Sequence, residues 1–236
     1  MMRLAILSDI HGNIFALDAV LDKIAQARVD RIIFLGDFTG YYYHPKEVFD
    51  CLNKMGATMI LGNHERMLFD CADGIIDAEV LRQKYGSGHK LALQKFSTSE
   101  LDQLRNLPEF HLETLNDFSI GYFHGSPFDN DFYLYPDASP SILSKCDVGI
   151  DYIFVGHSHY PFITQLDHGI LINVGSVGQS RVLGGIASWC LFDVESGELE
   201  IQTTHYDTEL LLKLVNQYDP DIVYLSKILK RGIKDE

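Results

Sequence analysis

Five short polar motifs in this chain carry carboxylate, imidazole and amide side chains, all of which can bind metal ions. In the first motif Asp9 and His11 are two residues apart, so in an extended turn they point the same way, as two ligands of one cation should. Each motif follows a run of apolar residues, and the five occupy positions 8–13, 36–37, 62–65, 124–127 and 156–159. The pattern therefore predicts a metal site assembled from five segments.

The donor atoms are a mixture of nitrogen and oxygen. Asp37 has two carboxylate oxygens and could bridge two cations, whereas Asn63 offers a neutral carbonyl oxygen. Imidazoles come from His124, His157 and His159. Such a set suits Mn, Fe, Zn, Co or Ni better than Mg, which prefers oxygen ligands and water. Because no thiolate occurs in the motifs, the set argues against a structural zinc site.

The elements expected to position these side chains alternate between strands and helices. Apolar runs predict strands at 3–7, 32–35 and 58–61. Between them, apolar residues at helical spacing follow Asn13, a plausible N-cap, and a second helix is expected from Pro45 to Met55. This order is typical of a parallel layered sheet. Loops at the ends of such strands carry function, so we expect the motifs to converge.

The remainder of the chain divides into a helical segment and a second group of strands. Residues 65–115 are polar and helix-prone without strand runs, which predicts a helical insertion or cap on a single domain spanning 1–236. Strands are expected at 118–123, 152–155, 170–173, 187–194 and 198–203. One C-terminal helix should include 210–215, and a second should follow Pro220.

Composition narrows the class of protein. The chain has 236 residues, of which 46% are apolar, and a formal net charge of -14. A chain this acidic repels the phosphate backbones of long DNA or RNA, so binding to them is disfavoured. Bound cations could still attract a small phosphate substrate. Four scattered cysteines and the absence of both a signal peptide and a long apolar run predict a cytoplasmic protein that does not enter membranes.

In this order and spacing, the five motifs resemble those of the calcineurin-like metallophosphoesterases. The resemblance runs from about residue 4 to about residue 190, and the segments 40–41 and 173–179 look most like the small prokaryotic phosphodiesterase branch. It implies an α/β fold in which two mixed β-sheets flanked by helices form a four-layer α-β-β-α sandwich. The strand and helix order described above agrees with that fold.

The resemblance also implies a cofactor and roles for named residues. It implies two divalent transition-metal ions, with Mn favoured over Fe, Zn, Ni or Co. A hydroxide bridging the two ions would attack a phosphate ester, and His64 would assist the leaving group. The first ion would be held by Asp9, His11, Asp37 and His159, and the second by Asp37, Asn63, His124 and His157.

Two positions depart from the protein-phosphatase branch, in which an Asp and an Arg follow the Gly-Asp motif. Here Gly40 and Tyr41 stand at those positions, so His64 lacks that carboxylate partner and we expect its pKa to lie near about 6.5. The run at 41–43 could pack against the cap, or Tyr41 could form an aromatic wall for a substrate. Arg181 could clamp a phosphate or form a surface salt bridge.

The best-supported function is therefore hydrolysis of a phosphodiester or small nucleotide-type substrate. The alternatives are a phosphomonoesterase, a protein phosphatase-like enzyme, a nuclease, or a non-catalytic scaffold that keeps the fold. The intact ligand set argues against a scaffold, and the acidic charge argues against a nuclease. Whether the chain forms a homo-oligomer stays open. Glu65 is expected to begin a helix or support a ligand, and five further histidines are expected to be structural or solvated: His44, His89, His111, His168 and His205.

Overall fold

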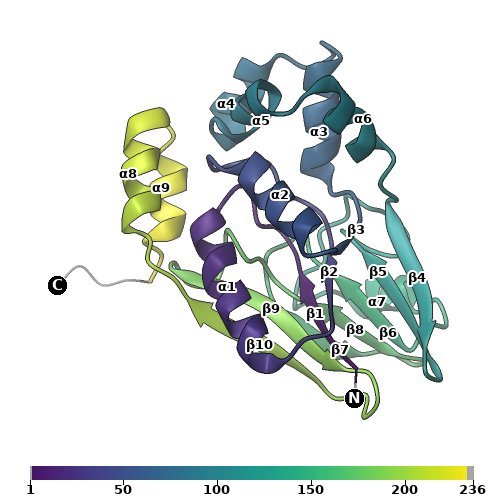
Figure 1. The fold of residues 1–236 in the computed structure, drawn as a ribbon. Coiled ribbons are helices and arrows are strands. Elements are labelled where there is room, and N and C mark those ends of the chain that lie inside the picture. The colour runs from purple at the N-terminus through teal and green to yellow at the C-terminus, as the bar shows by residue number, and fades with distance from the viewer. Residues whose placement is uncertain (1, 233–236) are drawn as a thin grey trace.

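Two five-stranded β-sheets form the frame of the structure, a computed structural model that describes residues 2–232 (Figure 1). In the first sheet β1, β2 and β3 are parallel, whereas β9 runs antiparallel to both β1 and β10. The strands, in the order β10-β9-β1-β2-β3, are β10 (Leu199–His205), β9 (Ile186–Asp193), β1 (Arg3–Leu7), β2 (Arg31–Phe34) and β3 (Thr58–Met59).

The second sheet is also mixed. Its central strands β5, β6 and β8 are parallel, and an antiparallel strand closes each edge. The strands, in the order β4-β5-β6-β8-β7, are β4 (Phe110–Leu115), β5 (Phe118–Phe123), β6 (Tyr152–Val155), β8 (Ile170–Asn173) and β7 (Phe162–Gln165). Strands β1, β2 and β3 of the first sheet and β5 and β6 of the second thus end in the loops that carry the five motifs.

Both edge strands of the second sheet differ from the sequence-based expectation. Residues 110–115 were expected to be free of strands but form β4, and β7 was not predicted. Along β4, exposed Phe110 and Leu112 alternate with half-buried His111 and Glu113. An edge strand with one partner and a solvated face has no continuous apolar run, so its sequence does not stand out.

The core lies between the two sheets. In β1, Leu4 and Ile6 point into the layer between the sheets, whereas Ala5 and Leu7 pack against helices on the other face. Across the layer, the rings of Phe154 and Phe192 have centroids 5.6 Å apart. This two-fold alternation along each strand is what builds one layer on each face.

Helices cover the outer faces and complete the predicted sandwich. Helices α1 (Ile14–Ala27) and α2 (Pro45–Lys54) lie on the first sheet, and α7 (Pro140–Cys146) packs on the second. The Asn13 side chain accepts a hydrogen bond from Ala16 N and caps α1, as predicted. The four-layer arrangement of two mixed sheets flanked by helices is therefore confirmed. Within residues 2–232, no helix combines the length and apolar character needed to cross a bilayer.

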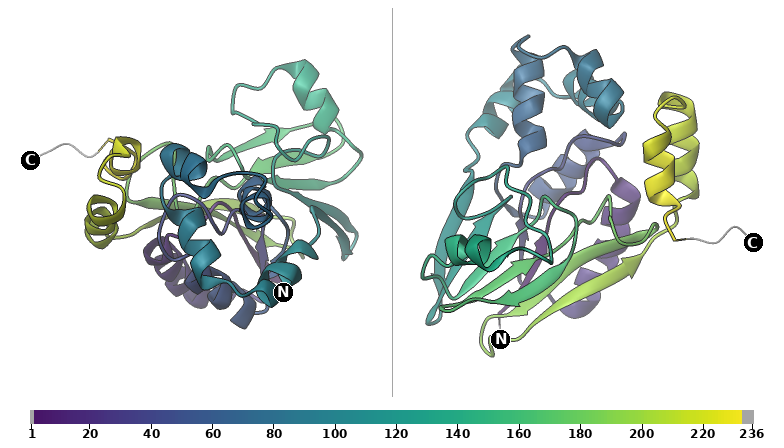
Figure 2. Two further views of the ribbon diagram at one scale, coloured as in Figure 1. Left: turned by 90° about the horizontal axis from the view of Figure 1, so that it is seen from above. Right: turned by 180° about the vertical axis from the view of Figure 1, so that it is seen from behind.

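Two further groups of helices lie beyond the strand ends that carry the motifs (Figures 1 and 2). The first group consists of α3 (Asn63–Ala72), α4 (Ala78–Tyr85), α5 (Gly88–Lys95) and α6 (Thr98–Arg105). Its buried side chains belong to the same hydrophobic core as those of α1 and α2. This shared core supports the single domain expected from the sequence, which stays a prediction. The second group is the C-terminal pair α8 (Glu209–Tyr218) and α9 (Val223–Leu229), which packs against the loop at 41–43.

Candidate metal centre

Four of the predicted histidines each direct one ring nitrogen into a common buried cluster and use the other to bond a backbone carbonyl. A neutral imidazole carries a single proton, so the nitrogen that donates to a carbonyl holds that proton and the other has a bare lone pair. The four donor bonds are His11 Nδ1 to Thr39 O (2.9 Å), His124 Nδ1 to Leu35 O (2.8 Å), His159 Nδ1 to Gln179 O (2.8 Å) and His157 Nε2 to Asp131 O (3.1 Å).

The bare nitrogens face one another at close range. His11 Nε2 lies 3.1 Å from His159 Nε2, and His124 Nε2 lies 3.0 Å from His157 Nδ1. When both rings of a pair are neutral and donate to carbonyls, two lone pairs meet, and only a proton or a cation between them removes the repulsion. A cation between them turns that repulsion into coordination, and metal-binding histidines typically donate their other nitrogen in this way.

Two aspartates complete the same cluster with matching geometry. Asp9 Oδ2 accepts from His157 N at 2.9 Å, and its Oδ1 lies 3.1 Å from His159 Nε2. Asp37 Oδ1 accepts from His64 N at 2.9 Å, whereas its Oδ2 lies 3.3 Å from His124 Nε2. Each carboxylate therefore has one oxygen fixed by a backbone N–H and one directed into the cluster. Asp9 Oδ1 is buried without a hydrogen-bond donor, as expected of a metal ligand.

The donor atoms fall into two neighbouring groups. Asp9, His11 and His159 form one, and Asp37, His124 and His157 form the other, while His11 and Asp37 also form a third such group with His64. Asp37 Oδ2 is also 3.8 Å from His11 Nε2, so this carboxylate lies between the groups. The amide oxygen of Asn63 lies 3.0 Å from His124 Nε2 and extends the second group. The seven predicted ligands thus lie together, and their chemistry fits a pair of divalent transition-metal ions.

The backbone at these positions is itself unusual. Five of the seven have a left-handed φ between 52° and 64°, a region that costs a side-chain-bearing residue on the order of 1–2 kcal/mol. Hydrogen bonds between segments far apart in the chain hold the strained turns, for example from His11 N to Asp37 O and from Gly178 N to Asp9 O. Strain of this kind persists where the surroundings enforce it and is concentrated at functional sites. The five residues are Asp9, His11, Asp37, His157 and His159.

The electrostatics also favour a bound cation. Although burial opposes ionisation, the neighbouring histidines hold the pKa values of Asp9 and Asp37 well below the usual range. Among the described residues neither carboxylate pairs with a Lys or Arg, so two buried negative charges depend on imidazoles or metal for compensation. Burial lowers the pKa of His157 to about 4, so this ring is neutral at physiological pH.

Glu65 supports the site without entering the cluster. From the first turn of α3 its carboxylate accepts hydrogen bonds from Asp37 N (2.7 Å), Gly62 N (2.9 Å) and Thr39 N (3.2 Å). It thereby ties the second motif to the third, in the supporting position expected from the sequence. Burial and the charge of Asp37 raise the pKa of Glu65 to about 7.

Comparison with known proteins gives the family. A family model for the calcineurin-like phosphoesterase superfamily domain matches residues 2–197. This chain belongs to that superfamily. The Uncharacterized protein MJ0912 of Methanocaldococcus jannaschii is 32% identical over 224 residues, covering 86% of this chain and 88% of that protein.

Solved structures share the fold at lower identity. The crystal structure of hypothetical protein PH1004 from Pyrococcus horikoshii OT3 has a TM-score of 0.85 at 22% identity and covers both chains fully. A structure described as a novel archaeal phosphodiesterase has a TM-score of 0.51 at 18% identity and covers 86% of this chain and 99% of that one. The resemblance to the superfamily and its small prokaryotic phosphodiesterases is thus confirmed.

His64 lies beside this superfamily site, with a partner that the sequence did not suggest. Its Nδ1 lies 3.3 Å from Nε2 of His89, a fully buried residue in α5. The solvated alternative for His89 is therefore wrong. No motif contains His89, and its contact with His64 spans 25 residues, so no pattern could have found it. Burial lowers the pKa of His64 well below the expected value, which corrects the expectation of an unperturbed imidazole.

The two predicted substrate-binding residues lie next to the cluster. The Tyr41 ring is buried, with its centroid 4.6 Å from that of His11 and 5.1 Å from that of His64. Arg181 lies over the ring of Tyr224 from α9, at 5.6 Å from its centroid. Within residues 2–232 Arg181 pairs with no carboxylate, and its buried Nε makes no hydrogen bond. The alternative that Arg181 forms a surface salt bridge is therefore wrong.

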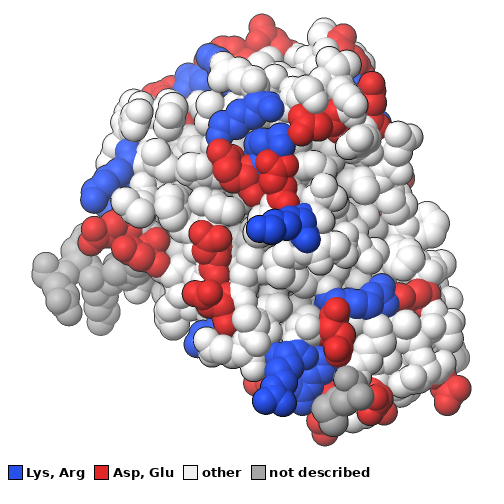
Figure 3. All heavy atoms as spheres, in the orientation of Figure 1, with Lys and Arg blue, Asp and Glu red and all other residues white. Residues whose placement is uncertain are grey.

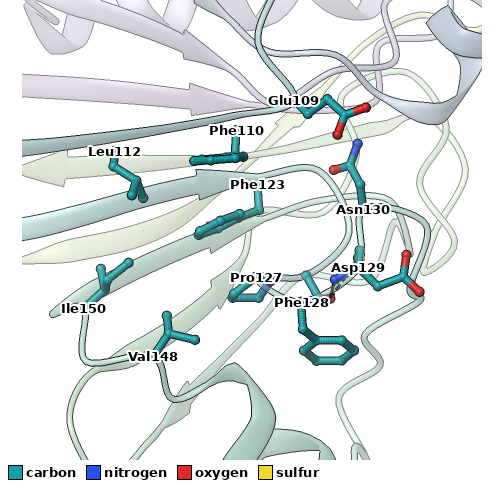
Figure 4. Close-up of a pocket in the computed structure, with 11 residues that line it drawn as sticks. Glu109, Phe110, Leu112, Phe123, Pro127, Phe128, Asp129, Asn130, Val148 and Ile150 are labelled. Carbon is teal, nitrogen blue, oxygen red and sulfur yellow. Dashed lines mark hydrogen bonds between the residues drawn. The ribbon is translucent and has the colours of Figure 1, made fainter.

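A surface pocket adjoins the second donor group. Its volume is about 320 Å³, and Tyr85 and Tyr133 line it together with Asn63 and His157. The Tyr133 ring lies over His157, with centroids 3.9 Å apart. A more apolar hollow of about 450 Å³ lies on the outer face of β4 and β5 and contains none of the seven candidate ligands (Figure 4). The pocket beside Asn63 therefore lies where a small ligand could reach the candidate ligand residues.

Charged side chains are interspersed on the face drawn in Figure 3. Lys and Arg side chains alternate with Asp and Glu there, and no continuous basic stripe crosses that face of the described chain. With the net charge of -14, this distribution offers no track for a long phosphate backbone on that face.

Proposed function

We propose that this protein is a dinuclear metal-dependent phosphoesterase. The observation that carries the proposal is the meeting of imidazole nitrogens at 3.0 and 3.1 Å beside two buried carboxylates, a set of donors suited to cations. One ion would be held by Asp9, His11, Asp37 and His159, and the other by Asp37, Asn63, His124 and His157. Mn is the favoured metal, and Fe, Zn, Ni or Co would also suit the mixed donor set.

When bound, two such cations acidify a water molecule and neutralise the oxygens of a phosphoryl group. The protein side chains would orient the phosphate and stabilise the leaving group. His64 presents a ring N–H to the leaving-group oxygen, which gains negative charge as its bond to phosphorus breaks. Arg181, which lacks a carboxylate partner, would orient a non-bridging phosphate oxygen. Tyr41 fixes the ring of His64 from one side.

A phosphodiester or small nucleotide-type compound is the proposed substrate. The pocket beside Asn63 and His157 has aromatic walls in Tyr85 and Tyr133, and aromatic faces stack on nucleobases. Its volume of about 320 Å³ would admit a small ligand and exclude a folded protein substrate. We further propose a cytoplasmic location, in agreement with the sequence.

The test is a panel of mono- and diesters assayed with each divalent metal. We expect Mn-dependent hydrolysis with diesters preferred and two cations per chain by elemental analysis. His64→Ala should keep both cations, lose little activity on a nitrophenyl ester, and lose roughly 10²–10⁴-fold on an alkyl ester, whose poor leaving group depends on the N–H. His168→Ala is the matched control, because His168 is exposed. Two bound cations without activity on any ester would favour the scaffold alternative.

A further inference from the structure

The contact between His64 and His89 has the geometry of a directed interaction. The two ring planes differ by 14°, the centroids are 5.0 Å apart, and His64 Nδ1 lies 3.3 Å from His89 Nε2. In this arrangement the N–H of one ring can donate to the lone pair of the other. Both side chains are buried, so no bulk water competes for the bond.

Two glycines make the contact sterically feasible. A Cβ added to Gly40 would lie 2.2 Å from His64 Nδ1. A Cβ added to Gly88, the first residue of α5, would lie 2.7 Å from the carbonyl oxygens of both Gly40 and Tyr42. The start of α5 can therefore approach the loop after the second motif only because neither position has a side chain. His89 thereby occupies the space next to His64 Nδ1.

The C-terminal helices hold α5 in that place. Asp219 lies between α8 and α9, is fully buried, and accepts hydrogen bonds from Ser87 N (2.8 Å) and Ser87 Oγ (2.7 Å). Ser87 is the residue before Gly88 and the N-cap of α5. Asp219 lies beyond residue 197, where the family match ends. The support for the position of His89 therefore comes from outside the segment that matches the family model.

The remaining ring nitrogens indicate the direction of the bond. Among the described residues His64 Nε2 has no hydrogen-bond partner, and the buried Nδ1 of His89 has none either. If His64 donated, His89 would carry its proton on Nδ1, leaving a buried N–H unpaired. If His89 donates from Nε2, its buried Nδ1 keeps only a lone pair, and the N–H without a partner is at His64 Nε2, an atom that is not fully buried. An N–H that can reach solvent costs less than one buried without a partner. Burial lowers the pKa of His89 to about 4, so the ring is neutral and has one proton to place.

We propose that His89 is a positioning residue that donates from Nε2 to His64 Nδ1 and so keeps the ring proton of His64 on Nε2. The bond at one imidazole nitrogen sets the protonation of the other. His64 then offers an oriented Nε2–H to the leaving-group oxygen. No proton is exchanged between the two histidines in this arrangement, because each keeps its own. The inference rests on the proposed role of His64 in the reaction.

The test compares three variants in the Mn-loaded enzyme. His89→Leu removes the donor at similar volume, His89→Gln restores an N–H where Nε2 was, and His168→Leu is the exposed control. For an alkyl ester we expect His89→Leu to lower kcat about 10- to 100-fold with KM and cation content unchanged. The loss should be smaller for a nitrophenyl ester. His89→Gln should recover most of the loss, and His168→Leu should lose nothing.

Nitrogen-15 chemical shifts of the imidazoles provide a readout that needs no substrate. The wild-type protein should have His64 protonated on Nε2, and His89→Leu should convert it to a mixture of tautomers. Protonation of wild-type His64 on Nδ1, equal losses in the Leu and Gln variants, or an unchanged kcat in His89→Leu would overturn the inference. If the wild-type enzyme hydrolyses no ester, the proposed function fails, while the spectrum still decides whether His89 sets the tautomer.

Discussion

Replacing Gly62 by alanine should weaken both proposed cation sites, whereas replacing Gly156 should weaken one. A Cβ at Gly62 would lie 2.1 Å from Asp37 Oδ1, and a Cβ at Gly156 would lie 2.0 Å from Ser8 Oγ and 2.6 Å from Asp9 Oδ2. Neither glycine has a left-handed φ, so alanine is compatible with the backbone and the effect comes from the contact alone. Asp37 lies between the two donor groups, but Asp9 belongs to the first.

The magnitude follows from the cost of overpacking. To reach the ordinary van der Waals distance of 3.4 Å, the added methyl group must push Asp37 Oδ1 by about 1.3 Å or Asp9 Oδ2 by about 0.8 Å. Such insertions cost about 1–3 kcal/mol. If that strain opposes coordination, the affinity of each affected site for its cation falls by roughly 5- to 150-fold. Gly62→Ala should show this loss at both sites, and Gly156→Ala at the site of Asp9 only.

Calorimetric titration of the metal-free variants with Mn²⁺, with elemental analysis of the loaded proteins, measures both affinities. The control is Gly149→Ala, because a Cβ at Gly149 meets no atom within 4 Å. Its left-handed φ of 74° should cost some stability and leave metal binding unchanged. The reasoning is refuted if Gly62→Ala binds both cations as tightly as Gly149→Ala, or if Gly156→Ala weakens both sites equally.

Three other perturbations test separate parts of the site and core. Asp37→Asn should lower the affinity of both cations, whereas His159→Ala should empty mainly the first, and elemental analysis distinguishes them. Despite burial, Asp37 raises the pKa of His124 to about 9. The charged His124 ring therefore stabilises the metal-free protein fully below about pH 6.5, and this stabilisation is lost as the pH rises to 9. Cation binding should then release a proton at pH 7.5, and calorimetry in two buffers that shows none would contradict this. Phe154→Ala, between the sheets, should lower the unfolding free energy by about 3–5 kcal/mol in urea titrations and spare the ligand geometry.

The buried strands of this fold were predictable because each is a short apolar run. The sequence predicts β1, β5, β6 and β8 with the bounds that the structure has, since both faces of these strands are covered. The edge strands β4 and β7 were missed, because half of their side chains meet solvent and the apolar run is broken. The same reason makes edge strands difficult to predict from a single sequence.

The set of candidate metal ligands could be predicted from the sequence, because side-chain type and motif order are properties of the sequence itself. Asp9, Asp37 and the motif histidines follow from residue type and spacing alone, and the fold brings them into one cluster. Only the tertiary structure decided which nitrogen of each ring faces that cluster, because the carbonyls that fix the tautomers come from other strands and loops. It also decided that His89 meets His64 and that Asp219 supports the start of α5. Contacts between residues so far apart in the chain depend on how the layers pack, and no local pattern encodes that.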